Sequence, residues 1–414
     1  MDRTLQPAFQ KSSVFVLPTP ERIQGSGRGE IIYLPSALGE VVKIEVVFQA
    51  GRYDDPMPGV AFFTAKMLNK GVVGKDANQI ANTLDYFGAQ MSSDASFDFT
   101  MVTLYALRKN LNKLLPLFLS IIKEPTFPEE ELNNYRKIFI ENLKISLEKN
   151  DYVGSCWIGQ KIFANHPYGN TVQIEDAAKI NVPLLTSFYT KHLHPFKIFI
   201  TGAIEPSDLE FLLENTAFEG DTKAERNFTL EPESPITQAI DGPNKVQASI
   251  KMARRTIPRS HPDVPGLQLA NHLLGGFFGS RLMKNIREEK GLTYGIHSYL
   301  QNYSRASILN ISADVNAEKS QIALEEIAKE IGRLPDVSEG ELEIAKNHFI
   351  GSFQNEITTV FEAAQKIKTL ILHGLPLDYY QNFIHRVSMI KPSDIEGITQ
   401  QYLRSDGFST VVVK

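Results

Sequence analysis

The chain has 414 residues, 42% hydrophobic and 22% charged, so it is long enough for two or three globular domains. Its net charge of −5 is spread along the sequence without a basic block, which argues against nucleic acid or an anionic membrane as a partner. No run of about 18 apolar residues is present, so the sequence predicts no membrane-spanning segment.

The first residues and the cysteine usage predict a cytoplasmic protein. Residues 1–18 have neither the apolar core of a secretory signal nor the Arg-rich, acid-poor character of a mitochondrial presequence. The single Cys156 excludes an intramolecular disulfide and fits a reducing compartment. Because Cys156 stands beside Trp157 in an apolar stretch, we expect it in the core.

The first half of the chain alternates between strand and helix patterns. From Val42 to Ala50, Ile44, Val46 and Phe48 alternate with polar residues, which predicts a half-buried strand. A loop rich in Asp and Pro follows. The remaining predicted elements are helices at about 60–70, 78–87, 109–123 and 129–149 and two strands within 92–107. The last two helices are rich in Leu, Ile and Phe, so we expect them in the core.

The second half repeats this order. A strand is predicted at 245–254, a helix at 265–274, a glycine turn and a second helix, strands at 292–299 and 306–315, and helices at 317–334 and from about 338. After the glycine turn, Ser280 is the expected N-cap of the second helix. Leu282, Met283 and Ile286 have helical spacing and should face a core.

Short sequence words also recur between the halves. PTFPEEEL and PDVSEGEL end in Glu-Leu pairs whose glutamates, Glu131 and Glu341, are separated by 210 positions. We therefore predict two homologous domains, at 1–218 and 244–414, joined by the polar segment 219–243. Strand pairs separated by short turns favour an α+β fold, a mostly antiparallel sheet covered by helices on one face.

Two stretches resemble the M16, or pitrilysin-like, metallopeptidase family: GVAFFTAKMLNKG in the first half and GSRLMKNIREEKGLTYGIHS in the second. The resemblance implies two α/β-roll domains that face each other in a clam-shell arrangement around a peptide. It also implies that Arg287 helps to hold the substrate and that Tyr294 steadies the tetrahedral intermediate. The glycines of the turn, Gly275, Gly276 and Gly279, would let the backbone approach a bound peptide closely.

The zinc site of that family is missing from the first half. Active members carry H-x-x-E-H on one helix face, where two imidazoles bind zinc and the carboxylate activates water. Here those positions are Phe62, Ala65 and Lys66, and the position of the further glutamate falls at Asn142. Phe and Ala offer no lone pair, protonated Lys repels a cation, and an amide is a poor zinc ligand. We expect packing for Phe62 and Ala65, and a solvated Lys66 or one paired with Glu141.

No second site replaces it in the sequence. Among the nine histidines only His192 and His194 are close, spaced as on one side of a strand, and no Cys or paired carboxylate accompanies them. His272 is expected in the core or a cavity wall, and His297 on the strand face of Thr293, away from Tyr294. Neither a phosphate-binding loop nor a G-x-S-x-G nucleophile elbow occurs.

These features together predict the non-zinc subunit of a heterodimeric M16-type peptidase. It would have no cofactor of its own, with zinc only in a partner subunit, and would supply Arg287 and Tyr294 for peptide hydrolysis in the partner's site. Two alternatives stay open: a catalytically inactive scaffold like the core proteins of respiratory complex III, and a self-associating peptide-binding homodimer. The partner that co-purifies would discriminate between the three.

Overall fold

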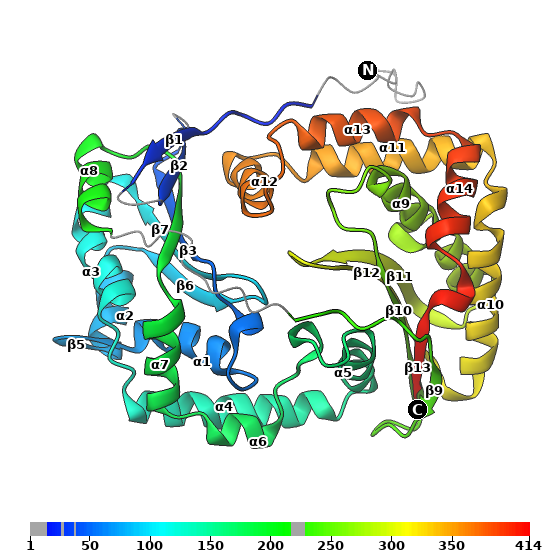
Figure 1. The fold of residues 1–414 in the computed structure, drawn as a ribbon, viewed down its shortest axis with the longest axis horizontal. Coiled ribbons are helices and arrows are strands. Elements are labelled where there is room, and N and C mark those ends of the chain that lie inside the picture. Colours follow the sequence, from blue (N-terminus) through cyan, green and yellow to red (C-terminus); the bar gives the residue numbers. More distant parts are fainter. Residues whose placement is uncertain (1–14, 26–28, 37–38, 217–227) are drawn as a thin grey trace, which may run out of the picture.

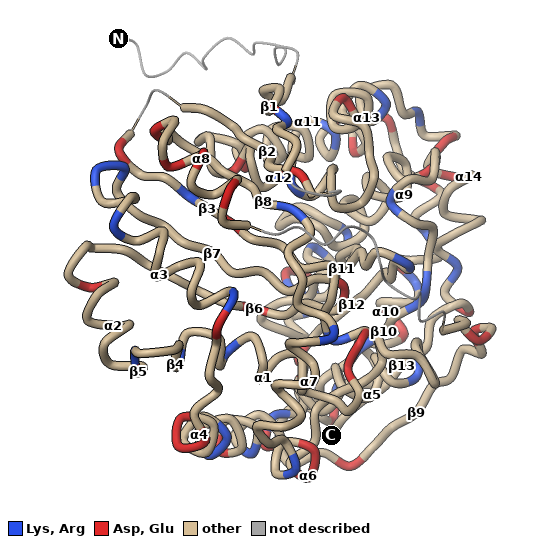
Figure 2. Tube along the Cα trace, turned by 60° about the vertical axis from the view of Figure 1, so that its left-hand side comes forward, with Lys and Arg blue, Asp and Glu red and all other residues tan. Residues whose placement is uncertain are grey.

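A computed structural model describes residues 15–25, 29–36, 39–216 and 228–414. In this part of the chain no helix is both long enough and apolar enough to cross a membrane. Basic and acidic residues are interspersed along the elements of both halves (Figure 2). The two halves stand opposite each other, each with its own sheet and helices (Figure 1).

The first half is built on a six-stranded sheet in the order β1-β2-β8-β3-β7-β6. Only β2 and β8 pair in parallel; the other neighbours are antiparallel. The strands are β1 (Glu21–Gln24), β2 (Glu30–Leu34), β3 (Val41–Phe48), β6 (Gln90–Ala95), β7 (Thr100–Leu107) and β8 (Pro195–Thr201). A separate two-stranded ribbon joins β4 (Gly71–Val72) to β5 (Lys75–Asp76).

Eight α-helices accompany this sheet in the described residues. They are α1 (Val60–Met67), α2 (Ala77–Tyr86), α3 (Leu111–Lys123), α4 (Glu129–Leu147), α5 (Asn150–Ile162), α6 (Ile174–Lys179), α7 (Val182–His192) and α8 (Pro206–Asn215). Apolar residues of α1, α3 and α7 pack against the face of the sheet that carries Ile44, Val46 and Phe48. This is the core that the alternation in β3 predicted.

The second half has a five-stranded sheet in the order β11-β12-β10-β13-β9. Its strands are β9 (Thr237–Ile240), β10 (Gln247–Thr256), β11 (Thr293–Asn302), β12 (Ser307–Asn316) and β13 (Ser409–Val413). The short β9 lies within the range expected for the linker and pairs in parallel with β13, whereas the other neighbours are antiparallel. The sheets are therefore mixed but mostly antiparallel.

The helices of the second half, apart from α12, cover one face of that sheet. They are α9 (Val264–Asn271), α10 (Ser320–Arg333), α11 (Glu339–Asn355), α12 (Val360–Leu372), α13 (Tyr379–Met389) and α14 (Pro392–Tyr402), with two π-helical segments, η5 (His272–Gly276) and η6 (Met283–Glu289). Leu282 and Ile286 are fully buried in this core, as predicted, and Met283 is partly buried against it.

Helices at matching positions begin at a constant offset. Glu129 and Glu339 open α4 and α11, Asn150 and Val360 open α5 and α12, and Val182 and Pro392 open α7 and α14, each pair 210 positions apart. The order of elements thus repeats in three dimensions, which is the duplication that the Glu-Leu words indicated.

One helix from each half packs on the sheet of the other half. Helix α12 lies between the halves (Figure 1), and its Ile371 and Leu372 pack on Val47 and Phe199 of the first sheet. In the opposite direction, Ile158 of α5 packs with Val411 and Val413 of β13. The approach of α5 is so close that a Cβ on Gly154 would lie 3.0 Å from the Lys251 side chain. Helices α5 and α12 occupy equivalent positions in the repeat.

This exchange corrects the prediction of a half-buried β3. Its polar residues Lys43 and Glu45 are buried along with Val47, because α12 covers the face that the alternation assigned to solvent. The charges are paired: Glu45 Oε1 lies 2.5 Å from Nζ of Lys368 on α12 and 2.9 Å from Nζ of Lys43. A charged face can therefore be an interior face when a distant helix brings the opposite charge.

Helix α4 departs from its prediction in the other direction. Of its 19 residues only Leu132 and Leu143 are fully buried, and Ile138 and Ile145 are more than half exposed. The helix runs along the outside of the first half (Figure 1), so only part of its apolar surface packs against the core. Cys156 is likewise only half-buried, and burial raises the pKa of its thiol.

Candidate functional site

The helix face that corresponds to H-x-x-E-H is filled by packing. Phe62 lies 5.7 Å, centroid to centroid, from Phe139 and 6.4 Å from Tyr135, both on α4. Ala65 is fully buried. Lys66 lies 5.8 Å from the centre of the Phe62 ring and forms an ion pair with Asp94 of β6. An aromatic cluster between α1 and α4 thus occupies the place of a metal centre.

The predicted alternative, a pairing of Lys66 with Glu141, was wrong. Glu141 pairs with Lys144 of its own helix at 2.7 Å, because residues three apart on a helix are neighbours. Asn142, the position of the further ligand, is exposed on α4. Within the described residues, no three His, Cys, Asp or Glu side chains gather as metal ligands would. The side chains present at the four motif positions do not fit zinc.

Arg287 and Tyr294 lie on either side of the corner between η6 and β11. Arg287 is half-buried, with its guanidinium 4.9 Å from the centre of the exposed Phe278 ring. The side chain of Tyr294 is 94% exposed. A strand residue that presents nearly its whole phenol to solvent is unusual, because aromatic side chains on strands commonly pack on neighbours.

A β-bulge sets the position of Tyr294. Thr293 pairs with Val315 and Ile296 with Ala313, so β11 carries one extra residue across this interval. Val315 and Ala313 both face the helical core, which places Thr293 and Ile296 on that same face. The predicted sharing of a face by Thr293 and His297 is therefore wrong, because the bulge interrupts the alternation on which it rested.

The glycines of the turn are required by packing inside the chain. A Cβ on Gly275 would lie 2.8 Å from the backbone nitrogen of Ser298, and one on Gly276 would lie 2.8 Å from Nδ1 of His272. A Cβ on Gly279 would lie 2.7 Å from the Phe277 ring. The turn is thus pressed against β11 and its own neighbours.

Ser280 does not cap the following helix with its side chain. Its hydroxyl is buried and finds no hydrogen-bond partner among the described residues, while its carbonyl accepts from the backbone N–H of Lys284 at 3.0 Å. His192 and His194 also differ from their prediction. His192 ends α7, with its ring centre 5.0 Å from that of Phe188, so the two histidines do not share a strand.

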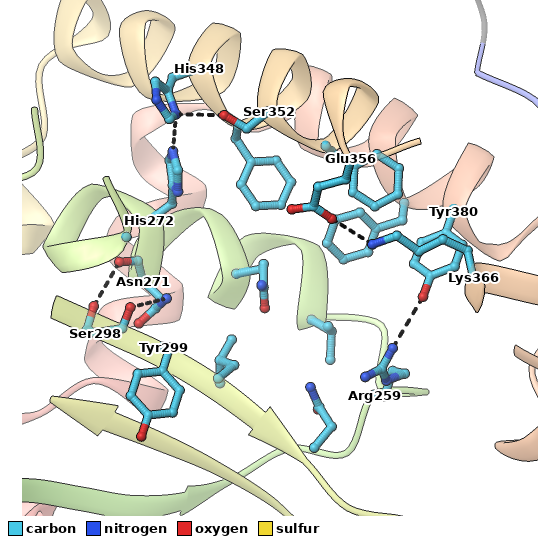
Figure 3. Close-up of a pocket in the computed structure, with 18 of the residues that line it drawn as sticks. Arg259, Asn271, His272, Ser298, Tyr299, His348, Ser352, Glu356, Lys366 and Tyr380 are labelled. Atoms are coloured by element: carbon cyan, nitrogen blue, oxygen red, sulfur yellow. Dashed lines mark hydrogen bonds and ion pairs between the residues drawn. The ribbon is translucent and has the colours of Figure 1, made fainter. Parts of the chain in front are cut away.

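A cavity of about 420 Å³ lies in the second half, between α9, α11, α12, α13 and β11. On one wall, Nε2 of His272 lies 3.0 Å from Nδ1 of His348, which in turn lies 3.3 Å from Oγ of Ser352 (Figure 3). Burial and the neighbouring His348 lower the pKa of His272 to about 4. His272 lines a cavity wall, as expected.

Sequence reasoning missed this cavity as a site. The available signal was the four-residue spacing of His348 and Ser352 on α11 and of Glu356 at its C-cap, which places the three on one helix face. That signal is weak by itself, because the opposite wall comes from segments 50 to 90 positions away.

Family comparisons agree with this architecture. Residues 31–173 match the model described as insulinase, peptidase family M16, and residues 179–349 match the model described as the peptidase M16 inactive domain. The fold is thus that of a duplicated M16-type protein whose metal positions have changed. The chain belongs to peptidase family M16.

Its curated relatives carry names of two kinds. The chain is 25% identical over 365 residues to an uncharacterized zinc protease, YmxG, of Bacillus subtilis, covering 86% of this chain and 88% of that protein. It is 22% identical over 407 residues to the non-peptidase homolog YmxG of Helicobacter pylori, covering 92% of this chain and 91% of the other.

Solved structures share the fold over nearly the whole chain. The peptidase M16 inactive domain from Pseudomonas fluorescens superposes with a TM-score of 0.87 at 22% identity, covering 96% of this chain and 98% of that one. A protease from Helicobacter pylori gives 0.85 at 18% identity, covering 96% and 100%. The periplasmic protease PqqL from Escherichia coli gives 0.78 at 15% identity, and there the match spans 49% of the longer chain.

Proposed function

We propose that this chain is the non-zinc-binding subunit of a heterodimeric M16-type peptidase. A zinc-bearing M16 subunit would be its partner, and a peptide would be the substrate. Family membership and the non-peptidase name of the Helicobacter pylori relative support a chain without hydrolytic activity of its own. The packed face of Phe62, Ala65 and Lys66 supports the same view, because nothing there can hold the metal.

The observation that carries the proposal is the exposure of Tyr294. A phenol that is 94% exposed on a bulged strand has its hydroxyl available to a group outside its own chain. In a site assembled from two subunits, that hydroxyl would donate to the oxyanion that develops on the peptide carbonyl. Arg287, half-buried against Phe278, would hold a substrate carbonyl or carboxylate with its planar guanidinium.

Two further surfaces fit a subunit of a larger assembly. The exposed Ile138 and Ile145 of α4 are apolar side chains that a protein partner would remove from water. Strand β6 is an edge strand of the first sheet, and its free backbone groups could pair with an extended peptide. Such pairing binds backbone and so gives affinity with little sequence preference.

The test is purification of the chain from its own cells by a tag at one end, followed by activity assays with the co-purified proteins. We expect an M16 subunit with an intact H-x-x-E-H motif, and peptide hydrolysis that requires both chains and stops with a chelator. Respiratory subunits in its place would support the scaffold, and a dimer of this chain alone would support the peptide-binding homodimer. Either result contradicts the proposal.

A further inference from the structure

The cavity in the second half is a half-open pocket with polar groups at its two ends and aromatic rings between them (Figure 3). Its volume of about 420 Å³ lies within the range of ligand pockets, roughly 300 to 1,000 Å³. The aromatic side chains that line it are Phe349, Phe353, Tyr379, Tyr380 and Phe383. Rings of this kind favour an apolar or aromatic ligand group.

One end of the cavity carries a positive charge for which the described residues supply no counter-ion. Arg259, in the segment that follows β10, donates from Nη1 to the hydroxyl of Tyr380 at 3.4 Å, and its Nε is buried without a partner. No ion pair involving Arg259 occurs in the described residues. The nearby Lys366 differs, because its Nζ is paired with Glu356 at 2.7 Å. Among the described residues that line this end, the cationic group without an ion pair is therefore the guanidinium of Arg259.

The other end carries an unused acceptor. Asn271, the last residue of α9, is only 5% exposed and donates from Nδ2 to the carbonyl of Ser298 at 3.3 Å. Its Oδ1 is buried and accepts no hydrogen bond from the part of the chain that the structure describes. A buried acceptor left unpaired is unfavourable, so a ligand that donates to Oδ1 would recover that loss.

We propose that this cavity binds one residue of a peptide whose carboxylate stands next to an apolar or aromatic side chain. The carboxylate pairs with Arg259, the apolar side chain lies among the rings, and an N–H of the peptide donates to Oδ1 of Asn271. The carboxylate can be the peptide's free C-terminus or an acidic side chain, since both present the same group to a guanidinium. The choice of a peptide as ligand rests on the proposed function.

Binding of short peptides to the isolated chain tests this inference. The probes are Ac-Ala-Gly-Phe with a free C-terminus, the same peptide as an amide, and Ac-Ala-Asp-Phe-amide. The binding of each is measured by calorimetry or ligand-observed NMR. We expect the free acid to bind and the simple amide to bind at least about tenfold more weakly, because a charge-assisted hydrogen bond is lost. Binding of the Asp peptide would assign the site to acidic side chains as well.

Variants locate the binding. Arg259→Met should weaken binding of the free-acid peptide at least about tenfold. Arg259→Lys should keep part of that affinity, because a positive charge remains. Arg333→Met is the matched control, since Arg333 is a largely exposed arginine of α10 outside the cavity. Ser352→Trp, which fills the cavity and leaves its charges in place, should abolish binding. These variants remain informative if one of them fails to fold.

Equal binding of acid and amide, binding of none of the three peptides, or unchanged binding by Arg259→Met would each overturn the inference. The experiment uses this chain without a partner and measures no hydrolysis. Its failure can thus be told apart from a failure of the heterodimer proposal, which depends on Tyr294 and co-purification.

Discussion

At the residue scale, the two halves differ: the altered zinc positions on α1 of the first half lie in internal contacts, whereas Tyr294 of the second half is exposed. Phe62 and Ala65 have become packing residues, and Lys66 has found a carboxylate partner in Asp94. Tyr294, in contrast, makes little use of its own chain for burial. A side chain that contributes little to its own fold can be changed without loss of stability, so its function can be tested cleanly.

Tyr294→Phe in the reconstituted complex should lower kcat by about 10² to 10³, the usual effect of removing one oxyanion donor, and leave KM nearly unchanged. The melting temperature of the chain should not move, because the hydroxyl is exposed. Tyr86→Phe is the control, since Tyr86 of α2 is also a strongly exposed tyrosine. Steady-state kinetics with a chromogenic peptide measure the effect, and an unchanged kcat would remove Tyr294 from the mechanism.

His272 predicts how stability depends on pH. Its pKa is about 4 in the folded chain and about 6.5 when unfolded, because burial and His348 disfavour the imidazolium. The unfolded state therefore binds more protons between these values, and stability falls as pH drops from about 6.5 to about 4. The loss should reach up to about 3 kcal/mol. His272→Gln should flatten this decline in urea titrations, and an identical pH slope would contradict the assignment.

At the element scale, the exchange of α5 and α12 joins the halves. The buried Glu45 of β3 lies between Lys43 and Lys368, so one carboxylate serves two ammonium groups. On the opposite side, Lys251 of β10 pairs with Asp151 of α5. Each sheet thus receives a helix from the other half, and each of these contacts includes an ion pair.

Glu45→Ala should destabilise the chain by about 3 to 5 kcal/mol, since it leaves two buried ammonium groups without a counter-charge. Lys368→Met should cost less than half as much, because Glu45 keeps its pair with Lys43. Glu141→Ala on the exposed face of α4 is the control and should stay within about 0.5 kcal/mol. Urea unfolding measures all three, and equal losses for Glu45→Ala and Lys368→Met would contradict this order.

Helix α4 supplies a test of the partner. Ile145→Asp should leave the melting temperature of the isolated chain within about 3 °C, because surface substitutions change stability little. In the complex it should weaken association at least about tenfold, since a charge would enter an apolar contact. Ile322→Asp on α10 is the matched control, with similar exposure in the other half. Analytical ultracentrifugation of the mixed subunits provides the measurement.

At the scale of the whole molecule, the chain keeps the duplicated M16 fold but has lost the zinc ligands. The isolated chain should contain no stoichiometric zinc by elemental analysis after purification without chelators, because none of the four motif positions offers a suitable ligand. It should also fail to cleave short peptides by itself. About one zinc per chain, or chelator-sensitive hydrolysis by the lone chain, would overturn the reading of Phe62, Ala65, Lys66 and Asn142.

The sequence by itself determined most of the order of elements within 42–149 and 245–338, the duplication and the loss of the zinc ligands. These are local properties: the period of apolar residues, the spacing of recurring words and the chemistry of four side chains. They hold wherever the segments end up in space. The strand of Ile44, Val46 and Phe48 and the helix of Leu282 and Ile286 were predicted correctly for this reason.

Only the tertiary structure decided which of those faces meet protein and which meet solvent. The second face of β3 became interior because α12 arrives from more than 300 positions away with Lys368, and α4 kept Ile138 and Ile145 exposed because nothing in the described chain covers them. The bulge before Ile296 and the cavity of Arg259 and Asn271 have the same origin. Burial and hydrogen-bond satisfaction are set by neighbours in space, and a local pattern cannot specify those neighbours.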